Sequence, residues 1–237
     1  MESVQRASSL TDQAIESIRA SIVSGDLVPG ELYMATKLGR QLNVSRTPIR
    51  EALQELARRG LVRIERNRGV RMLSTSLQSF VEVFQIRLML EAPLASRATQ
   101  LKDPAFSAAV EESYEAFRRV AESGEPGRVL RADRDFHRTL LSGAGNANAN
   151  QLLSEQRDVV LNTGVGTVPT SRTAQECFED HLDIMVAFRE GRPQDVSTAV
   201  ARHISHTATM LIAQATRDRP EFGDAGSAEA IEWLVHD

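Results

Sequence analysis

The stretch VSRTPIREAL, residues 44–53, decides the fold of the N-terminal part of the chain. Ser45 can cap a helix, and Pro48 then falls in the first turn, where its missing N–H costs no hydrogen bond. Arg46 and Arg50 lie four residues apart and share one helix face beside small hydroxyl groups. The apolar face of the same helix comprises Ile49, Ala52, Leu53 and Leu56. The stretch therefore predicts a short helix with two arginines near its N-terminus.

Two helical patterns precede this helix, and a hairpin pattern follows it. The first pattern begins at Thr11 or Asp12 as the N-cap, and the second is broken at Asn43. After the quoted helix the apolar period changes from helical to two, which is typical of strands. The expected strands and their turn are residues 62–65, 70–72 and 66–69. Three short helices closed by a β-hairpin predict a winged helix-turn-helix.

From residue 77 onward we find only helical patterns, separated by breaks rich in glycine and proline. The patterns cover residues 77–100, 104–122, 126–141, 148–161, 173–190 and 194–216. Helices of this length with short links predict an antiparallel bundle. The expected fold is mainly α, with a DNA-binding domain at 1–75, an all-helical effector-binding domain at 76–217 and a C-terminal tail at 218–237.

Charge is distributed unevenly along the chain. Residues 1–75 carry 12 basic and 8 acidic side chains, whereas residues 76–237 carry 16 and 24, so the two parts have net charges of +4 and −8. This division suggests that only the N-terminal part meets a polyanion.

Composition excludes several classes of protein. The chain is 41% hydrophobic and 25% charged, which is ordinary for a globular protein. No apolar run approaches the roughly 20 residues that span a bilayer, and the N-terminus lacks the apolar core of a secretory signal. The single cysteine, Cys177, excludes an intrachain disulfide framework and a Cys-rich zinc finger. We expect a cytoplasmic protein without a membrane partner.

Double-stranded operator DNA is the partner that fits the basic part. The recognition helix of a helix-turn-helix lies in the major groove, where its first residues reach phosphates and base edges. Arg46 and Arg50 can each donate two hydrogen bonds to guanine or clamp a phosphate, and Ser45 and Thr47 are expected to bind phosphate. Contacts with the neighbouring minor groove are expected from the hairpin tip, Arg66, Asn67 and Arg68.

A possible metal site lies in the C-terminal part. Asp133 and His137 are four residues apart in a helical pattern, so they share a face and can hold one divalent cation. His181 and His203 lie ten residues on either side of the break at 191–193, and a helical hairpin would bring them to one height, about 15 Å from the turn. Three imidazoles and one carboxylate suit zinc, nickel, iron or manganese.

The N-terminal motifs resemble the winged helix-turn-helix of the GntR family of bacterial transcription regulators. The matching residues are 25–30, Leu38, 44–53, Leu56, 60–62 and 69–70. The resemblance implies that operator DNA is contacted by Ser45, Arg46, Thr47, Arg50 and the wing residue Gly69. Members of the family commonly open the second helix with a polar cap and often an arginine, whereas this chain has residues 33–36, YMAT. We assign the backbone contact there to Thr36 and Lys37, with Arg40 as an alternative.

The C-terminal motifs resemble the FCD ligand-binding domain of the FadR subfamily. The matching residues are 87–91, 133–137, 179–181, Ala187, Gly191 and 201–204. The resemblance implies a metal held by Asp133, His137, His181 and His203. It also implies a small carboxylic or sugar acid effector that pairs with an arginine. Our candidate is Arg87, which shares a stripe with Phe80 and Phe84; a surface ion pair between Arg87 and Glu91 is the alternative.

Three functions compete at this stage. A metabolite-responsive regulator that binds an inverted-repeat operator as a homodimer explains the charge division, the recognition helix and the metal set. A metal-dependent hydrolase would rest on the histidines and the aspartate alone, and the sequence contains neither HExxH nor G-x-S-x-G. In a metal-free regulator the histidines would be core residues and the effector apolar or acyl.

Overall fold

The computed structural model describes residues 9–23, 26–28, 30–58, 61–73, 77–161 and 166–217. The chain divides into two compact units, one of Met1–Thr75 with Val159–Gly164 and one of Ser76–Asp158 with Val165–Asp237. The predicted tail at 218–237 lies outside the described residues.

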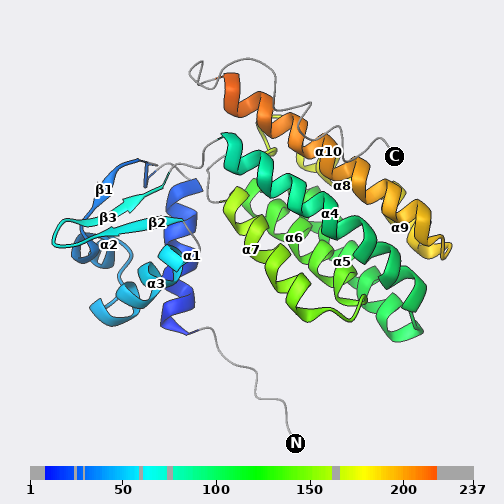
Figure 1. Cartoon of the computed structure of the whole chain (residues 1–237), viewed down its shortest axis with the longest axis horizontal. Helices are drawn as coiled ribbons and strands as arrows, with labels where there is room; N and C mark the ends of the chain where they lie inside the picture. Colours follow the sequence, from blue (N-terminus) through cyan, green and yellow to red (C-terminus); the bar gives the residue numbers. More distant parts are fainter. Residues whose placement is uncertain are drawn as a thin grey trace, which may run out of the picture. The chain divides into compact units, whose positions relative to one another are not determined.

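The first unit combines three helices with a small antiparallel sheet (Figure 1). The helices are α1 (Leu10–Val23), α2 (Ala35–Gln41) and α3 (Arg46–Arg58), and the strands are β1 (Leu32–Tyr33), β2 (Val62–Glu65) and β3 (Gly69–Met72). The strand order is β1-β3-β2. Apolar side chains from the helices and the sheet share one core, which includes Ile18, Leu38, Ile49, Leu56 and Met72. This architecture confirms the predicted winged helix-turn-helix.

Two local features of this unit differ from the prediction. Helix α1 is capped by Ser9 rather than by Thr11 or Asp12, because Ser9 Oγ accepts a hydrogen bond from the Asp12 N–H at 3.1 Å. The Asp12 carboxylate in turn accepts from the Ser9 N–H at 3.1 Å, so that the two residues cap the helix reciprocally. Strand β1 was not predicted, because two residues are too few to display a period of two. It exists through its pairing with β3.

Gly69 begins β3 with a φ of 134°, a backbone conformation that L side chains rarely adopt, and passes close to β1. A Cβ at this position would lie 2.4 Å from the carbonyl oxygen of Tyr33. We expect Gly69→Ala to lower the free energy of unfolding by about 1–3 kcal/mol, because the change strains the backbone and forces the strands apart. Gly30→Ala is the matched control, since Gly30 has a φ of 88° but nothing within 4 Å of the added Cβ. Equal losses of both variants in urea denaturation would contradict the close approach.

The second unit is a helical bundle (Figure 1). Its helices are α4 (Leu77–Leu101), α5 (Pro104–Ser123), α6 (Pro126–Ser142), α7 (Ala147–Leu161), α8 (Ala174–Glu179), α9 (Leu182–Arg189) and α10 (Pro193–Arg217). The long helices α4 and α10 pack side by side, and α5 packs against α6. The chain is therefore mainly α, as predicted. No helix in the described ranges is long and apolar enough to cross a membrane.

The predicted helix over 173–190 is wrong in one respect, because the chain forms two helices that meet at Asp180 and His181. Two contacts between residues close in the sequence accompany the break. Arg172 forms an ion pair with Asp180, and the ring of His181 turns back to the carbonyl of Cys177. No glycine or proline marks the position, so helical periodicity alone could not reveal it.

Candidate metal centre and DNA-binding surface

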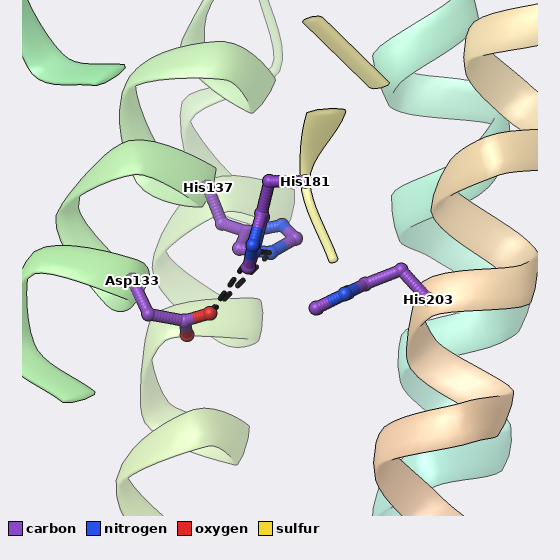
Figure 2. A group of neighbouring side chains, drawn as sticks. All are labelled: Asp133, His137, His181 and His203. Atoms are coloured by element: carbon purple, nitrogen blue, oxygen red, sulfur yellow. Dashed lines mark hydrogen bonds and ion pairs between the residues drawn. The ribbon is translucent and has the colours of Figure 1, made fainter. Parts of the chain in front are cut away.

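The four side chains predicted as metal ligands come together inside the second unit. Asp133 and His137 project from α6, His181 from the junction of α8 and α9, and His203 from α10 (Figure 2). One possible ligand atom of each residue lies within 4.8 Å of the others. His181 Nε2 lies 3.1 Å from His137 Nε2 and 3.1 Å from Asp133 Oδ1. The three imidazoles are buried, and Asp133 is partly exposed.

A hydrogen bond at His181 and a nearby carboxylate at His137 indicate which ring nitrogens carry lone pairs. His181 Nδ1 lies 2.9 Å from the carbonyl oxygen of Cys177, which can only accept, so Nδ1 carries the proton and Nε2 is bare. His137 Nδ1 lies 3.3 Å from Glu91 Oε2, whose negative charge favours a proton on that nitrogen. Two bare Nε2 atoms and one carboxylate oxygen of Asp133 then face one another. A shared cation would satisfy all three, so these residues fit a divalent transition metal.

Burial keeps His137 and His203 in the neutral form that binds metals. Burial, assisted by the nearby Arg157, lowers the pKa of His137 to about 4. Burial and then the neighbouring imidazole of His181 hold the pKa of His203 well below its usual value. Burial alone would raise the pKa of Asp133, but the imidazoles of His181 and His137 beside it and the guanidinium of Arg157 hold that pKa well below the usual range. The site therefore offers an ionised carboxylate and the neutral imidazoles of His137 and His203 at neutral pH.

In protein treated with a chelator, we expect the free energy of unfolding to fall as the pH drops from about 6.5 to about 4. An unfolded histidine takes up a proton near pH 6.5, whereas folded His137 does so only near pH 4. Within this window the unfolded state binds more protons and is favoured, by roughly 3 kcal/mol in total for one such group. Urea denaturation at pH 7.5 and 5 measures this loss of stability. His206→Ala removes an exposed histidine and should show the same loss between the two pH values. Equal stability at both pH values would contradict the buried, neutral state of His137.

A second group of buried charges adjoins the four candidate ligands. Arg87 Nε donates to Glu91 Oε1 at 2.7 Å, and the guanidinium of Arg157 contacts the other oxygen of Glu91. Arg157 Nη1 also lies 3.5 Å from Asp133 Oδ2. Burial alone would raise the pKa of Glu91, but Arg157 and Arg87 hold it well below its usual value. The alternative prediction was a surface ion pair between Arg87 and Glu91. The ion pair is present, but both side chains are buried.

Sequence reasoning missed Arg157 and gave Glu91 only as a partner of Arg87. Arg157 comes four residues after Leu153 and three before Val160, and all three side chains are buried. It therefore lies on the apolar stripe of α7, and a charged residue on such a stripe is the signal that could have identified it. Nothing local in the sequence pairs α7 with α4 or α6.

The predicted DNA contacts lie on the first unit. Ser45, Arg46, Thr47 and Arg50 are exposed at the start of α3. A hollow of about 500 Å³ between α2 and α3 is lined by residues that include Thr36, Arg40, Ser45 and Arg46. Lys37 is exposed beside this hollow, at the start of α2.

Predicted DNA contacts also lie at the start of α2 and at the hairpin tip. Met34 occupies the N-cap position of α2 without a side-chain hydrogen bond, so this helix lacks the polar cap expected of its relatives. Arg66, Asn67 and Arg68 are exposed at the tip, where Asn67 has a φ of 61°. Arg68 Nη1 lies 3.1 Å from Glu65 Oε2. Basic side chains are thus exposed both at the start of α3 and at the hairpin tip.

Comparison with known proteins gives matches for both units. The profile described as "Bacterial regulatory proteins, gntR family" matches residues 10–72, and that of the "FCD domain" matches residues 82–206, more than half of the chain. Members of these families are transcription regulators, not enzymes, which removes the hydrolase alternative.

Relatives and solved structures agree with these matches. A probable D-xylose utilization operon transcriptional repressor of Paenarthrobacter nicotinovorans is 29% identical over 83% of this chain and 86% of its own length. The uncharacterized HTH-type transcriptional regulator YdhC of Bacillus subtilis is 23% identical over 84% and 89%. The structure of McbR/YncC from E. coli has a similar fold, with a TM-score of 0.74 at 20% identity, over 88% of this chain and 100% of that one. The chain therefore belongs to the GntR family of transcription regulators and carries its FCD domain.

Proposed function

We propose that this regulator is metabolite-responsive, and that it holds a divalent transition metal through Asp133, His137, His181 and His203. The observation that carries the proposal is the convergence of two bare imidazole nitrogens and one carboxylate oxygen at 3.1 Å contacts. When bound, the metal would supply a positive charge to which an effector carboxylate can bind. Zinc, nickel, iron and manganese all suit this set of ligands.

The effector in this proposal is a small carboxylic or sugar acid, and Arg87 is its predicted partner in the protein. Arg87 is buried, lies 5.0 Å from the ring centroid of Phe84 and is linked through Glu91 to His137. The metal-free alternative with an apolar or acyl effector is disfavoured, because an apolar ligand would leave these charged groups without solvation.

Operator binding is proposed to involve two copies of the chain on an inverted repeat. One recognition helix contacts only a few base pairs, so specificity requires two half-sites. The proposed contacts are Thr36, Lys37, Ser45, Arg46, Thr47, Arg50, Arg66, Arg68 and Gly69. Such a regulator would act in the cytoplasm. Light scattering should report a dimer, and a monomer that still binds operator tightly would contradict the proposal.

Metal analysis of protein purified without a histidine tag tests the central claim. We expect about one equivalent of a divalent transition metal per chain, removable by a chelator and restored by adding the ion. Protein that neither retains nor rebinds a metal, yet still responds to an effector in an operator-binding assay, would favour the metal-free alternative.

A further inference from the structure

The buried charges around the candidate metal centre balance one another without a metal. Arg87 and Arg157 contribute two positive charges, and Glu91 and Asp133 contribute two negative ones. The imidazoles in the group are neutral as ligands. Arg172 and Asp180, near His181 in the described part of the chain, pair with each other, and Asp180 Oδ2 also lies 3.6 Å from His206 Nδ1. The net formal charge of the cluster is therefore zero.

A divalent cation would change this balance by two positive charges. Arg87, Glu91, His137, Arg157, His181 and His203 are each at most 6% exposed, so water can compensate little of that charge. An uncompensated charge in such surroundings is unfavourable, and a ligand that brings the opposite charge relieves it. Two negative charges would balance the loaded site, and an effector that carries both of them does so without a bound hydroxide.

Several buried polar atoms at the site also lack a partner within the described part of the chain. They are Arg157 Nε, His137 Nδ1 and His203 Nδ1, and Thr207 Oγ1 on the same helix as His203 is another such atom. Thr207 follows His203 by one turn of α10, so both side chains lie on one face of that helix. Arg157 Nε can only donate, and an anion is the partner that suits a free guanidinium edge. Arg157 Nε is therefore a free donor on a side chain that lies next to the candidate ligand Asp133.

We infer that the effector is a short dianion with two carboxylates, one directed to the metal and the other to Arg157. Asp133 fixes the separation of the two positions, because its Oδ1 faces His181 and its Oδ2 faces Arg157. The metal and the guanidinium therefore lie on opposite sides of one carboxylate group, which favours a chain of few carbons. The inference rests on the proposed metal site and selects a dicarboxylate over a mono-acid or a sugar acid with one carboxylate.

Matched pairs of ligands test the inference by calorimetry on protein loaded with one equivalent of zinc. The pairs are oxalate and oxamate, malonate and malonamate, and succinate and succinamate, in which an amide of equal size replaces one carboxylate. We expect at least one dianion to bind about tenfold or more tightly than its amide, since hydrogen bonds to charged groups are the stronger ones. The same dianion should give the largest rise in the melting temperature.

Variants of Arg157 test whether this residue binds the second carboxylate of the effector. Arg157→Met should bring the affinity ratio of the best pair to within about threefold, and Arg157→Lys should retain part of it. Arg202→Met is the control, because Arg202 is an exposed arginine of α10 paired with Asp183. The comparison of ligands on the unmodified protein stands even if Arg157→Met fails to fold.

The possible outcomes separate this inference from the proposed function. Equal binding of dianions and amides to zinc-loaded protein would overturn the dianion and leave a metal-dependent carboxylate sensor. A preference that persists in folded Arg157→Met would overturn the role of Arg157. Zinc-loaded protein that binds none of the carboxylates, or protein that binds none of zinc, nickel, iron and manganese, would overturn the proposed function together with the inference.

Discussion

Replacing His181 and His203 together by alanine is expected to reduce bound metal from about one equivalent per chain to almost none. The two residues supply half of the candidate ligands, and they are the ones that join α10 and the junction of α8 and α9 to α6. Asp133 and His137 would remain as a pair on one helix. Because loss of a supporting group alone typically lowers metal affinity 10–100-fold, loss of two ligands should lower it by more than about 100-fold. Elemental analysis and calorimetry with zinc measure the effect.

His206→Ala is the matched control for this double variant. His206 lies on α10 as His203 does, but it is exposed and faces only Asp180 among the described acidic side chains. Its replacement should leave the metal content unchanged. Circular dichroism must show that the double variant is folded, and a folded double variant that keeps its metal would remove His181 and His203 from the site.

The sequence predicted the four candidate ligands through short-range spacing. Asp133 and His137 are neighbours on one helix, and the break at 191–193 brings His181 and His203 together, with ring centroids 4.2 Å apart. Both relations follow from helical periodicity and from one chain reversal. The winged helix-turn-helix was predictable for the same reason, because its apolar faces and its turn are encoded within a few residues of each other.

Features that depend on distant segments were not predictable from the sequence. Arg157 meets Glu91 across 66 residues, and this contact depends on how α7 packs within the bundle. It was missed because periodicity reports the face of a helix but not its partner. The break at Asp180 and His181 was missed for a different reason, because its ion pair with Arg172 is short-range but no glycine or proline marks the position.

Replacing Arg46 and Arg50 by alanine is expected to cause the largest loss of operator affinity among surface changes in the first unit. Both side chains are exposed near the start of α3; Arg46 lines the hollow that α3 forms with α2, and Arg50 lines a second hollow beside the hairpin tip. An arginine that donates two hydrogen bonds to guanine contributes about 1–3 kcal/mol of discrimination, so each replacement should weaken binding by roughly 5- to 150-fold. Fluorescence anisotropy with a selected operator and with single-base variants measures both affinity and base preference.

The salt dependence of binding distinguishes the two kinds of contact that these arginines can make. If Arg46 or Arg50 reads a guanine, its alanine variant should lose preference at one base pair. If it clamps a phosphate, binding should weaken equally on all sequences, and the slope of log affinity against log salt should become shallower by about one. Arg58→Ala is the control, since Arg58 ends the same helix, is exposed and pairs with Glu55. Operator affinity that falls as much for Arg58→Ala as for the other two would mean that general positive charge on α3, rather than the start of the helix, governs binding.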